Sequence, residues 1–437
     1  MQAKKLLLIT YYWPPSGGAG VQRWLKLTDY LTQLGWQIFV VTVDENSASY
    51  PVVDESLNHE VNPNVKVYRT KTFEILNFYK KVNNKKQIPY AGFANEGRVG
   101  ALQYISRFIR GNFFIPDARK GWNKYALAKA TEIIERENIE YLVTTSPPHS
   151  TQLIGLQLRQ RFKLKWIADL RDPWTDIYYY HKMNHTLIAK SIDKNYERKV
   201  IETADGLVVV SDFIKKQFTT KTLLNVGNKF MILPNGYDEK NFQTGIKNDS
   251  IKNDNFVISY NGTIAADYPI NVFIDACKML FENNIDTKIK IQFTGRADAQ
   301  TQKKLREAFV EKVQFTNHVT HAKSIEILLE SNLLLLIIPE VKDNEGILTG
   351  KLFEYLAAQK TVLCIGPVNG NAAEIIKECN AGITINNSSV TEAYNLIDSE
   401  YSHWQNGTKS NFCNDDKYKK YARKSQAVIF ENWLVNV

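Results

Sequence analysis

The chain has 437 residues, of which 44% are hydrophobic, 12% aromatic and 23% charged, and its formal net charge is +9. This composition excludes an intrinsically disordered chain, and the length predicts two or three domains. The longest apolar run, residues 333–338, is far shorter than the roughly 18 residues of a transmembrane helix, so it predicts a buried strand.

In chain order, short β-rich runs alternate with amphipathic helical stretches through the first half of the sequence. The patterns predict strands over residues 6–10, 37–43, 141–145, 165–170, 206–210 and 229–233, and helices over 21–34, 125–136 and 151–161. Strands that alternate with helices of this length predict a parallel, doubly wound sheet.

The polar segment 243–255 predicts a linker, after which the alternation starts again. Strands are expected over residues 256–260, 288–293, 313–316, 333–338 and 361–365, and helices over 270–282, 301–309, 322–329, 350–358, 372–378 and 416–433. We therefore predict an α/β protein with two Rossmann-like, doubly wound parallel-sheet domains, residues 1–240 and 241–415, that face a cleft. Residues 416–437 are expected to form a crossover helix that packs back on the first domain.

Targeting and redox signals are few. Only four apolar residues follow Lys4 and Lys5, and no small-residue cleavage site comes after them. We therefore expect no signal peptide and a cytoplasmic protein that can also bind the inner face of the cell membrane. The four cysteines lie far apart and form no C-x-x-C pair, so we predict no metal ion and no bound cofactor.

The net positive charge comes from the first half of the chain. Residues 1–200 hold 29 Lys and Arg against 18 Asp and Glu, a net charge of +11, whereas residues 201–437 have a net charge of −2. A basic half predicts an anionic partner, which could be a nucleic acid, a phosphorylated substrate or an anionic lipid surface.

Residues 71–115 are the most basic part of that half. They carry eight Lys and Arg against two acids, with aromatic residues between them, and apolar residues at 101, 104, 105, 108 and 109 would give a helix one apolar stripe. This mixture favours an anionic membrane surface, and a solvated basic face is the alternative. No recognised nucleic-acid motif is present, so we predict no nucleic-acid partner.

A glycine-rich loop follows the first predicted strand. Its residues Gly18 and Gly20 stand just before a predicted helix, where backbone N–H groups can approach an anion, so both are candidate substrate-binding residues. Arg23 stands where the dinucleotide fingerprint has its third glycine. Asp44, at the end of the next strand, nevertheless keeps a dinucleotide site open, and a plain strand-to-helix turn is the further alternative.

Two other segments of the first half also follow strands, at the edge where a doubly wound sheet binds its ligands. They contain His149 and Asp172, which are candidate catalytic residues. A structural histidine and an ordinary Arg171–Asp172 salt bridge are the alternatives.

Three weaker signals are turns that follow strands. Asn235 precedes a glycine at the end of the first half, Gly262 and Thr263 end the first strand of the second half, and Arg296 follows another strand. Turn chemistry alone explains each of them, but all are candidates for substrate binding.

The sharpest signal is the segment 345–360. Lys351 and Glu354 are three residues apart at the start of a predicted helix that begins at Gly350, so they share a face. A lysine at a helix N-terminus can hold a diphosphate, and a carboxylate one turn later can accept two ribose hydroxyls. An ordinary surface ion pair is the alternative.

Taken together, these segments resemble the GT-B-fold glycosyltransferases of the large group 1 class, often called family 4. The resemblance covers nearly the whole chain. It depends on the order and spacing of the matching segments more than on any one motif. The segments that carry it are residues 11–23, 168–174, 204–211, 234–238, 260–263 and 351–358.

The resemblance implies a transferase that moves a sugar, of hexosyl type, from a nucleotide-diphospho-sugar donor, with retention and without an obligatory metal. The donor would bind mainly to the second domain. The first domain would bind the acceptor, a glycan or a lipid-linked sugar of cell-surface polysaccharide biosynthesis.

Residue by residue, Glu354 is similar to the second of two family glutamates, the one that binds ribose. The first of the pair falls at Gly346, so Glu345 is the candidate substitute. The loop 264–268 lacks the basic residues with which the family often faces the diphosphate, so the resemblance leaves Arg296 and Lys351 as the candidate cations, with Lys351 also a candidate catalytic residue.

Two other functions stay open. A nucleotide-sugar epimerase can have a similar two-domain fold, and it would change the donor without an acceptor. A catalytically inactive protein that binds sugar nucleotides would agree with Gly346 at the place of a glutamate.

Overall fold

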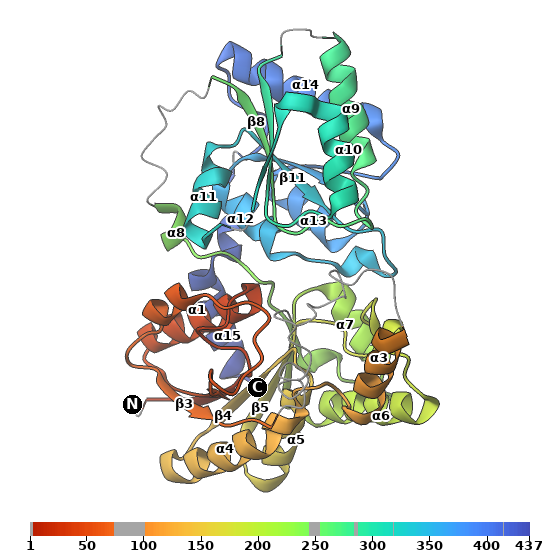
Figure 1. Ribbon diagram of the computed structural model, residues 1–437. Helices are drawn as coiled ribbons and strands as arrows, with labels where there is room; N and C mark the ends of the chain where they lie inside the picture. Colours follow the sequence, from red (N-terminus) through yellow and green to blue (C-terminus); the bar gives the residue numbers. More distant parts are fainter. Residues whose placement is uncertain (1–2, 74–100, 244–253, 284–286, 318, 414) are drawn as a thin grey trace. The chain divides into compact units, whose positions relative to one another are not determined.

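The computed structural model describes residues 3–73, 101–243, 254–283, 287–317, 319–413 and 415–437 (Figure 1). The chain divides into two compact units. The first comprises residues 1–234 together with 426–437, and the second comprises residues 235–425. The division therefore falls at 234/235 rather than at 240/241, and residues 416–425 belong to the second unit.

One seven-stranded sheet forms the centre of the first unit, with the order β3-β2-β1-β4-β5-β6-β7. Its strands are β1 (Lys5–Ile9), β2 (Gln37–Val43), β3 (Lys66–Thr70), β4 (Tyr141–Ser146), β5 (Lys165–Leu170), β6 (Gly206–Val209) and β7 (Phe230–Ile232). All neighbouring strands are parallel. Their carboxyl ends therefore lie at one edge of the sheet, the edge at which parallel sheets bind ligands.

Helices cover both faces of this sheet because the apolar residues of a strand alternate between two cores. Leu6 and Leu8 point into the core beneath α1 and α15, and Leu7 and Ile9 point into the core beneath α4 to α7. The helices of the unit are α1 (Ala19–Gln33), α3 (Ala101–Phe113), α4 (Asn123–Glu137), α5 (Ser150–Arg161), α6 (Leu187–Thr203), α7 (Asp212–Thr219) and α15 (Arg423–Leu434).

The second unit repeats this architecture on a six-stranded sheet with the order β10-β9-β8-β11-β12-β13, in which all neighbouring strands are again parallel. The strands are β8 (Phe256–Asn261), β9 (Ile289–Thr294), β10 (Val313–Thr316), β11 (Leu333–Ile337), β12 (Thr361–Ile365) and β13 (Gly382–Ile385).

Two helical layers enclose this second sheet. Helices α9, α10 and α14 share one core with the sheet, and α8, α11, α12 and α13 share the other (Figure 1). Their bounds are α8 (Lys240–Gln243), α9 (Asn271–Asn283), α10 (Ala299–Phe309), α11 (His321–Glu330), α12 (Gly350–Ala358), α13 (Asn371–Glu378) and α14 (Val390–Asn406).

The C-terminal helix packs on the first unit, as the sequence predicts. Ala427, Phe430 and Leu434 are fully buried in the core that α1 shares with the sheet, and the ring of Phe430 meets the edge of Trp24 at a centroid distance of 5.8 Å. The expected single helix over 416–433 is interrupted, because Ala422 is extended and separates a 3₁₀ turn from α15.

The chain enters and leaves the second unit along one path. The backbone N–H of Tyr237 donates to the carbonyl oxygen of Tyr421 at 3.1 Å, and the N–H of Arg423 donates to the carbonyl oxygen of Tyr237 at 2.8 Å. The two crossing segments are therefore joined by hydrogen bonds to each other.

Several elements were absent from the sequence-based expectations: β3, α6, α7, β13 and α14. Most of the expected linker 243–255 and residues 74–100 of the basic segment lie outside the described residues.

Candidate functional site

The start of α12 gathers most of the candidates in the second unit. Thr349 precedes the helix as its N-cap residue but makes no capping hydrogen bond with its side chain. Because the first N–H groups of a helix have no partners within it, this end can bind an anion. Gly350 is the first residue of the helix, and Lys351 is the second.

Lys351 lies folded back over the loop after β8. Its Nζ donates a 2.7 Å hydrogen bond to the Tyr260 hydroxyl, which in turn donates to the carbonyl oxygen of Thr263 at 2.7 Å. Burial of the ammonium lowers the pKa of Lys351 to about 7, although the nearby Glu354 carboxylate acts in the opposite direction. The side chain is therefore poised between its charged and neutral forms near neutral pH.

Two glycines allow the loops after β8 and β9 to approach each other. Gly262 and Gly295 have φ angles of +124° and +119°. A Cβ atom on Gly262 would lie 2.9 Å from Lys351 Nζ, and one on Gly295 would lie 2.4 Å from the carbonyl oxygen of Gly262. The φ angle favours glycine at both positions, and at Gly295 the Gly262 backbone also leaves no space for a side chain.

Glu354 lies one turn further along α12 and pairs with a residue of α11. Its Oε1 is 2.9 Å from Nε2 of His321, and both side chains are about a quarter exposed. His321 begins α11, whose N-cap residue Thr320 accepts a hydrogen bond from the Lys323 N–H. The carboxylate of Glu354 thus has a fixed partner and still faces solvent.

Three buried side-chain oxygens around this point have no hydrogen-bond partner among the described residues. They are Oδ1 of Asn261, Oγ1 of Thr294 and Oγ1 of Thr349. Asn261 and Thr294 are neighbours across β8 and β9, and the amide nitrogen of Asn261 is held by Ser324. Unsatisfied buried polar atoms are costly, so three of them at one edge of a sheet indicate a site built for a polar ligand.

The structure thus brings Gly262, Thr263, Gly350, Lys351 and Glu354 together. Other candidates of this unit stand apart from them. The backbone of Arg296 is close, since its carbonyl oxygen accepts the Ile264 N–H at 2.9 Å, but its side chain is exposed and pairs with none of the described residues. Glu345 lies beside Gly370 before α13, and Asn235 lies where the chain enters the unit. No contact among the described residues links Glu345 or Asn235 to Lys351.

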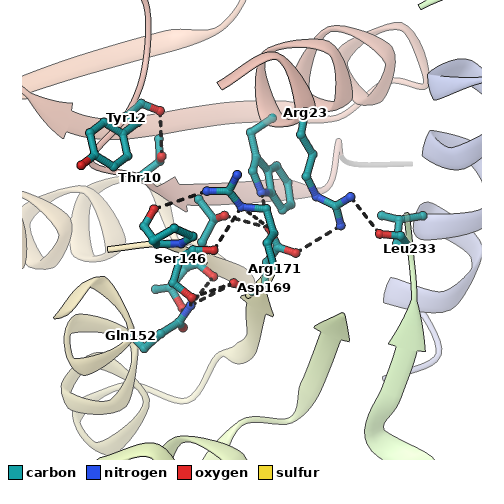
Figure 2. Close-up of polar contacts among 12 residues, drawn as sticks. Thr10, Tyr12, Arg23, Ser146, Gln152, Asp169, Arg171 and Leu233 are labelled. Carbon is teal, nitrogen blue, oxygen red and sulfur yellow. Dashed lines mark hydrogen bonds and ion pairs between the residues drawn. The ribbon is translucent and has the colours of Figure 1, made fainter. Parts of the chain in front are cut away.

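In the first unit, a buried ion pair organises the carboxyl edge of the sheet (Figure 2). Nη2 of Arg23 on α1 is 3.2 Å from Oδ1 of Asp169 at the end of β5, and both side chains are essentially inaccessible. Trp24 Nε1 and Thr145 Oγ1 donate to the other carboxylate oxygen at 2.7 and 2.8 Å. The Arg23 guanidinium also binds the carbonyl oxygens of Leu233 and Pro234, both at 2.8 Å.

Arg171 extends this network toward the glycine-rich loop. Its guanidinium donates to the carbonyl oxygens of Ser146 and Pro147 (Figure 2). It lies so close to Gly20 that a Cβ there would be 1.7 Å from Nη1. A side chain at position 20 would therefore displace the Arg171 guanidinium from this place. Around Gly18, just before α1, no atom lies within 4 Å of an added Cβ, and the φ of this residue is +108°.

His149 and Asp172 are both neighbours of Arg171, but no contact joins them to each other. The His149 ring stacks on Trp174 at 4.7 Å, and burial, with the charge of Arg171, lowers the pKa of His149 to about 3. Its Nδ1 is buried and has no hydrogen-bond partner in the part of the chain that the structure describes. Burial raises the pKa of the Asp172 carboxyl, against the opposing effect of Arg171. The alternative of an Arg171–Asp172 salt bridge is not found among the described residues, where Arg171 instead lies 3.9 Å from the carboxylate of Asp169.

Sequence reasoning missed the partners that hold these residues in place: Tyr260, His321 and the central role of Arg171. Tyr260 and His321 are 91 and 33 residues from the side chains that they bind. The only sequence signal was their position at strand and helix ends, which many other polar residues share.

Neither a metal cluster nor a membrane span is found in the described part of the chain. No group of three or more His, Cys, Asp or Glu there could hold a metal ion. Across the same residues, no helix is long and apolar enough to cross a bilayer.

No protein-family model matches the sequence, and no curated protein matches it either. Solved structures do match over the full length. A glycosyltransferase from Rickettsia africae ESF-5 has a TM-score of 0.56 and 13% identity, over 100% of this chain and 94% of that one. A UDP-forming α,α-trehalose-phosphate synthase from Burkholderia vietnamiensis has a TM-score of 0.61 and 12% identity, over 100% of both chains.

A third similar structure is described as a putative UDP-N-acetylglucosamine 2-epimerase, from Listeria monocytogenes. It has a TM-score of 0.54 and 11% identity, over 99% of this chain and 96% of that one. The chain therefore has the GT-B fold, and the fold that the sequence predicts is confirmed.

Proposed function

We propose that the protein is a glycosyltransferase that moves a sugar, of hexosyl type, from a nucleotide-diphospho-sugar to a glycan or lipid-linked acceptor. We place it in cell-surface polysaccharide biosynthesis, with retention at the anomeric carbon. The observation that carries the proposal is the cluster at the start of α12. There, Lys351 and Glu354 stand beside two glycine loops and three unpartnered oxygens. Similarity of fold to the Rickettsia and Burkholderia enzymes supports it.

In this proposal the second unit binds the donor. The diphosphate lies at the N-terminus of α12, where the charge that develops on the leaving group is stabilised by Lys351 and by unpaired N–H groups of Gly350 and Lys351. The Gly262 N–H takes no part, because it already donates to the carbonyl oxygen of Thr294 at 2.7 Å. The exposed Arg296 side chain supplies a second cation, and Glu354 accepts hydrogen bonds from the ribose hydroxyls.

The first unit binds the acceptor in this proposal. His149 is neutral at physiological pH, because burial disfavours its charged form. It therefore acts through hydrogen bonds of its ring rather than as a cation. Asp172 has no hydrogen-bond partner among the described residues, so its carboxylate is available to orient an acceptor hydroxyl. The N-terminus of α1 at Gly18 supplies further N–H donors.

The first prediction tests the donor site. Glu354→Gln keeps the size of the side chain and removes its charge. Losing one charge-assisted hydrogen bond costs about 1.5–3 kcal/mol, so the affinity for the preferred nucleoside diphosphate should fall roughly tenfold or more. Calorimetry with the diphosphates of uridine, guanosine, adenosine, cytidine and thymidine measures it.

The matched control is Glu326→Gln on α11, where the carboxylate is 59% exposed and pairs only with Lys323. It should leave the affinity unchanged. Equal affinity of Glu354→Gln and the parent would overturn the assignment of Glu354, and failure of the parent to bind any of the five diphosphates would overturn the proposed function.

The similarity to the Listeria protein favours one second candidate, a nucleotide-sugar epimerase. Incubation with the donor alone separates the two activities. An epimerase changes the sugar when no acceptor is present, whereas a transferase leaves it intact or hydrolyses it slowly. Donor binding with neither reaction, in the presence of a full set of acceptors, would instead indicate an inactive binding protein.

We also propose an anionic membrane surface as a partner, and no nucleic acid. The excess of +11 charges in residues 1–200 supports this, as does the basic segment 71–115. Of that segment, the structure describes residues 71–73 and 101–115, where Phe73, Tyr104 and Phe113 are exposed by 65%, 54% and 74%.

A further inference from the structure

The first turns of α6 carry large apolar side chains that nothing in the described structure covers. Leu187, Ile188 and Ile192 are exposed by 84%, 74% and 39%. Isolated exposed leucines are common on proteins, but three large apolar side chains exposed within six residues of one helix are a local concentration of apolar surface.

The same helix presents a row of positive charges. Lys190, Lys194, Arg198 and Lys199 are exposed, and none of them forms an ion pair with a described residue. On α10 and α11, by contrast, two exposed lysines have carboxylates at helical spacings, in the Lys303–Glu307 and Lys323–Glu326 pairs. The charge on α6 is therefore unneutralised.

The reason is that two of the three acids of α6 face inward, while the third, Glu202 near the end of the helix, accepts a hydrogen bond from the Thr222 hydroxyl at 2.6 Å. Asp193 accepts hydrogen bonds from Trp174 Nε1 and the Tyr180 hydroxyl at 2.8 and 2.9 Å. Glu197 accepts from the N–H and the hydroxyl of Thr175 at 3.1 and 2.6 Å. Both side chains are almost fully buried, so they contribute no negative charge to the outer face.

Helix α3 continues this surface. Residues 101–113 contain no acid and include Arg107 and Arg110. Asn112 binds the carbonyl oxygen of Asn184 at 3.0 Å and accepts the N–H of Thr186, the N-cap residue of α6, at 2.6 Å. The C-terminal end of α3, where Phe113 is exposed, therefore lies beside the N-terminal end of α6.

We propose that the outer faces of α3 and α6, which we call the α3/α6 face, dock the protein on an anionic lipid bilayer. Its three apolar residues on α6, with Phe113, enter the interface, and the basic side chains of α6 bind lipid head groups. A flat surface of spread negative charge fits this arrangement, because the positive charges of Lys190, Lys194, Arg198 and Lys199 are distributed along one helix and no carboxylate of the described residues forms an ion pair with them.

This docking surface rests on the proposed function, and it adds to that function the place from which the acceptor would come. The N-terminus of α6 follows the loop from β5, so it lies at the carboxyl edge of the sheet, the edge that holds Arg171 and Asp172. A protein docked through this face brings that edge to the bilayer. The acceptor is accordingly a lipid-linked sugar whose head group reaches the first unit from the membrane.

The experiment is co-sedimentation of the full chain with vesicles of phosphatidylcholine alone or of equal parts phosphatidylcholine and phosphatidylglycerol. The parent should bind only the anionic vesicles. Leu187→Ser with Ile188→Ser should abolish most of the binding, and Lys190→Gln with Lys194→Gln should weaken it roughly fivefold per lysine.

Two matched controls exist on the same chain. Leu223 and Leu224 are exposed by 106% and 58% but lie after α7, so Leu223→Ser with Leu224→Ser should bind as the parent does. Lys303→Gln with Lys304→Gln, on α10 of the second unit, should do the same. Thermal midpoints and nucleoside-diphosphate affinity equal to the parent's show that the α6 variants are folded.

Any other result contradicts the proposal that the α3/α6 face docks on an anionic bilayer. One is equal binding of the α6 variants and the parent; another is a parent that ignores both vesicles. A concentration-dependent dimer that only the α6 variants lose would identify a self-association surface instead. Vesicle binding needs no donor, so a negative result with vesicles does not contradict the donor site. A negative result in the calorimetry likewise does not contradict the docking surface.

Discussion

At the scale of single residues, Lys351 is a side chain whose charge changes near neutral pH. Its ammonium is buried against Tyr260 and Gly262, and this burial places its pKa near 7 instead of above 10. Below pH 7 the side chain is charged and attracts a diphosphate. As the pH rises above 7 in the free protein, the neutral amine becomes the main form, so binding of the anion must include the uptake of a proton.

We therefore predict that the affinity for a nucleoside diphosphate falls as the pH rises from 7 to 9, by up to about tenfold per unit. Calorimetry in buffers of different ionisation enthalpy measures both the affinity and the proton uptake. Lys351→Met should bind more weakly and lose the dependence, whereas Lys303→Met on the exposed face of α10 should retain it. A parent whose affinity is flat across this range would show that Lys351 does not contact the diphosphate in its charged form.

At the scale of elements, the loops after β8 and β9 set the shape of the candidate donor site. The Gly262 carbonyl oxygen lies so close to Gly295 that a Cβ added there would be 2.4 Å from it, so any side chain at position 295 would push the loop that leads to Thr263. The position of Lys351 over Gly262 depends on the same packing.

Gly295→Ala should lower the free energy of unfolding of the second unit by about 2–6 kcal/mol, because it adds a disfavoured backbone conformation to a backbone clash. Gly407 offers a matched control: its φ is +65°, but nothing lies within 4 Å of an added Cβ. Gly407→Ala should cost only about 1–2 kcal/mol. Urea denaturation followed by circular dichroism compares them, and equal costs would contradict the close approach of the two loops.

The success of sequence reasoning also differs between elements. The start of α12 was predicted to the residue, because Thr349 and Gly350 mark the N-terminus and the apolar period continues to Ala358. Helix α6 was missed because its inward face carries Asp193 and Glu197, which break the apolar period and are buried only through hydrogen bonds to Trp174, Tyr180 and Thr175.

Within the candidate site, the residues whose role follows from local spacing were predicted, and those that depend on tertiary contacts were not. Lys351 and Glu354 share a helical face, which a sequence reveals. The distance from His321 to Glu354 and the approach of Arg171 to Gly20 arise only when separate elements pack. Neither contact has a local pattern from which it could be predicted.

At the scale of the whole molecule, the first unit is discontinuous in sequence. Its core includes Ala427, Phe430 and Leu434 of α15, which the chain reaches only after passing through the second unit. The helix is fixed further by the hydrogen bond from Trp36 Nε1 to Glu431 at 2.9 Å. The stability of the first unit therefore depends on residues that are distant in sequence.

Phe430→Ala should lower the free energy of unfolding of the first unit by about 3–5 kcal/mol, because it leaves a cavity against Trp24. Ile429→Ala, at a side chain that is 48% exposed on the same helix, should change it by no more than about 0.5 kcal/mol. Tryptophan fluorescence during urea denaturation reports on this unit, since Trp404 alone of the eight tryptophans belongs to the second. Similar midpoints for the two variants would contradict the packing of α15.

The discontinuity of the first unit also has a consequence for biosynthesis. The ribosome delivers residues 235–425 as one uninterrupted stretch, so the second unit can fold as soon as that stretch has emerged. Residues 1–234 appear earlier but lack α15, and the apolar layer around Trp24 stays uncovered while the second unit is being made, for roughly 10–40 s at ordinary rates of elongation. The part of the chain made first is thus the last to be completed, and during that interval it is the part that chaperones must shield.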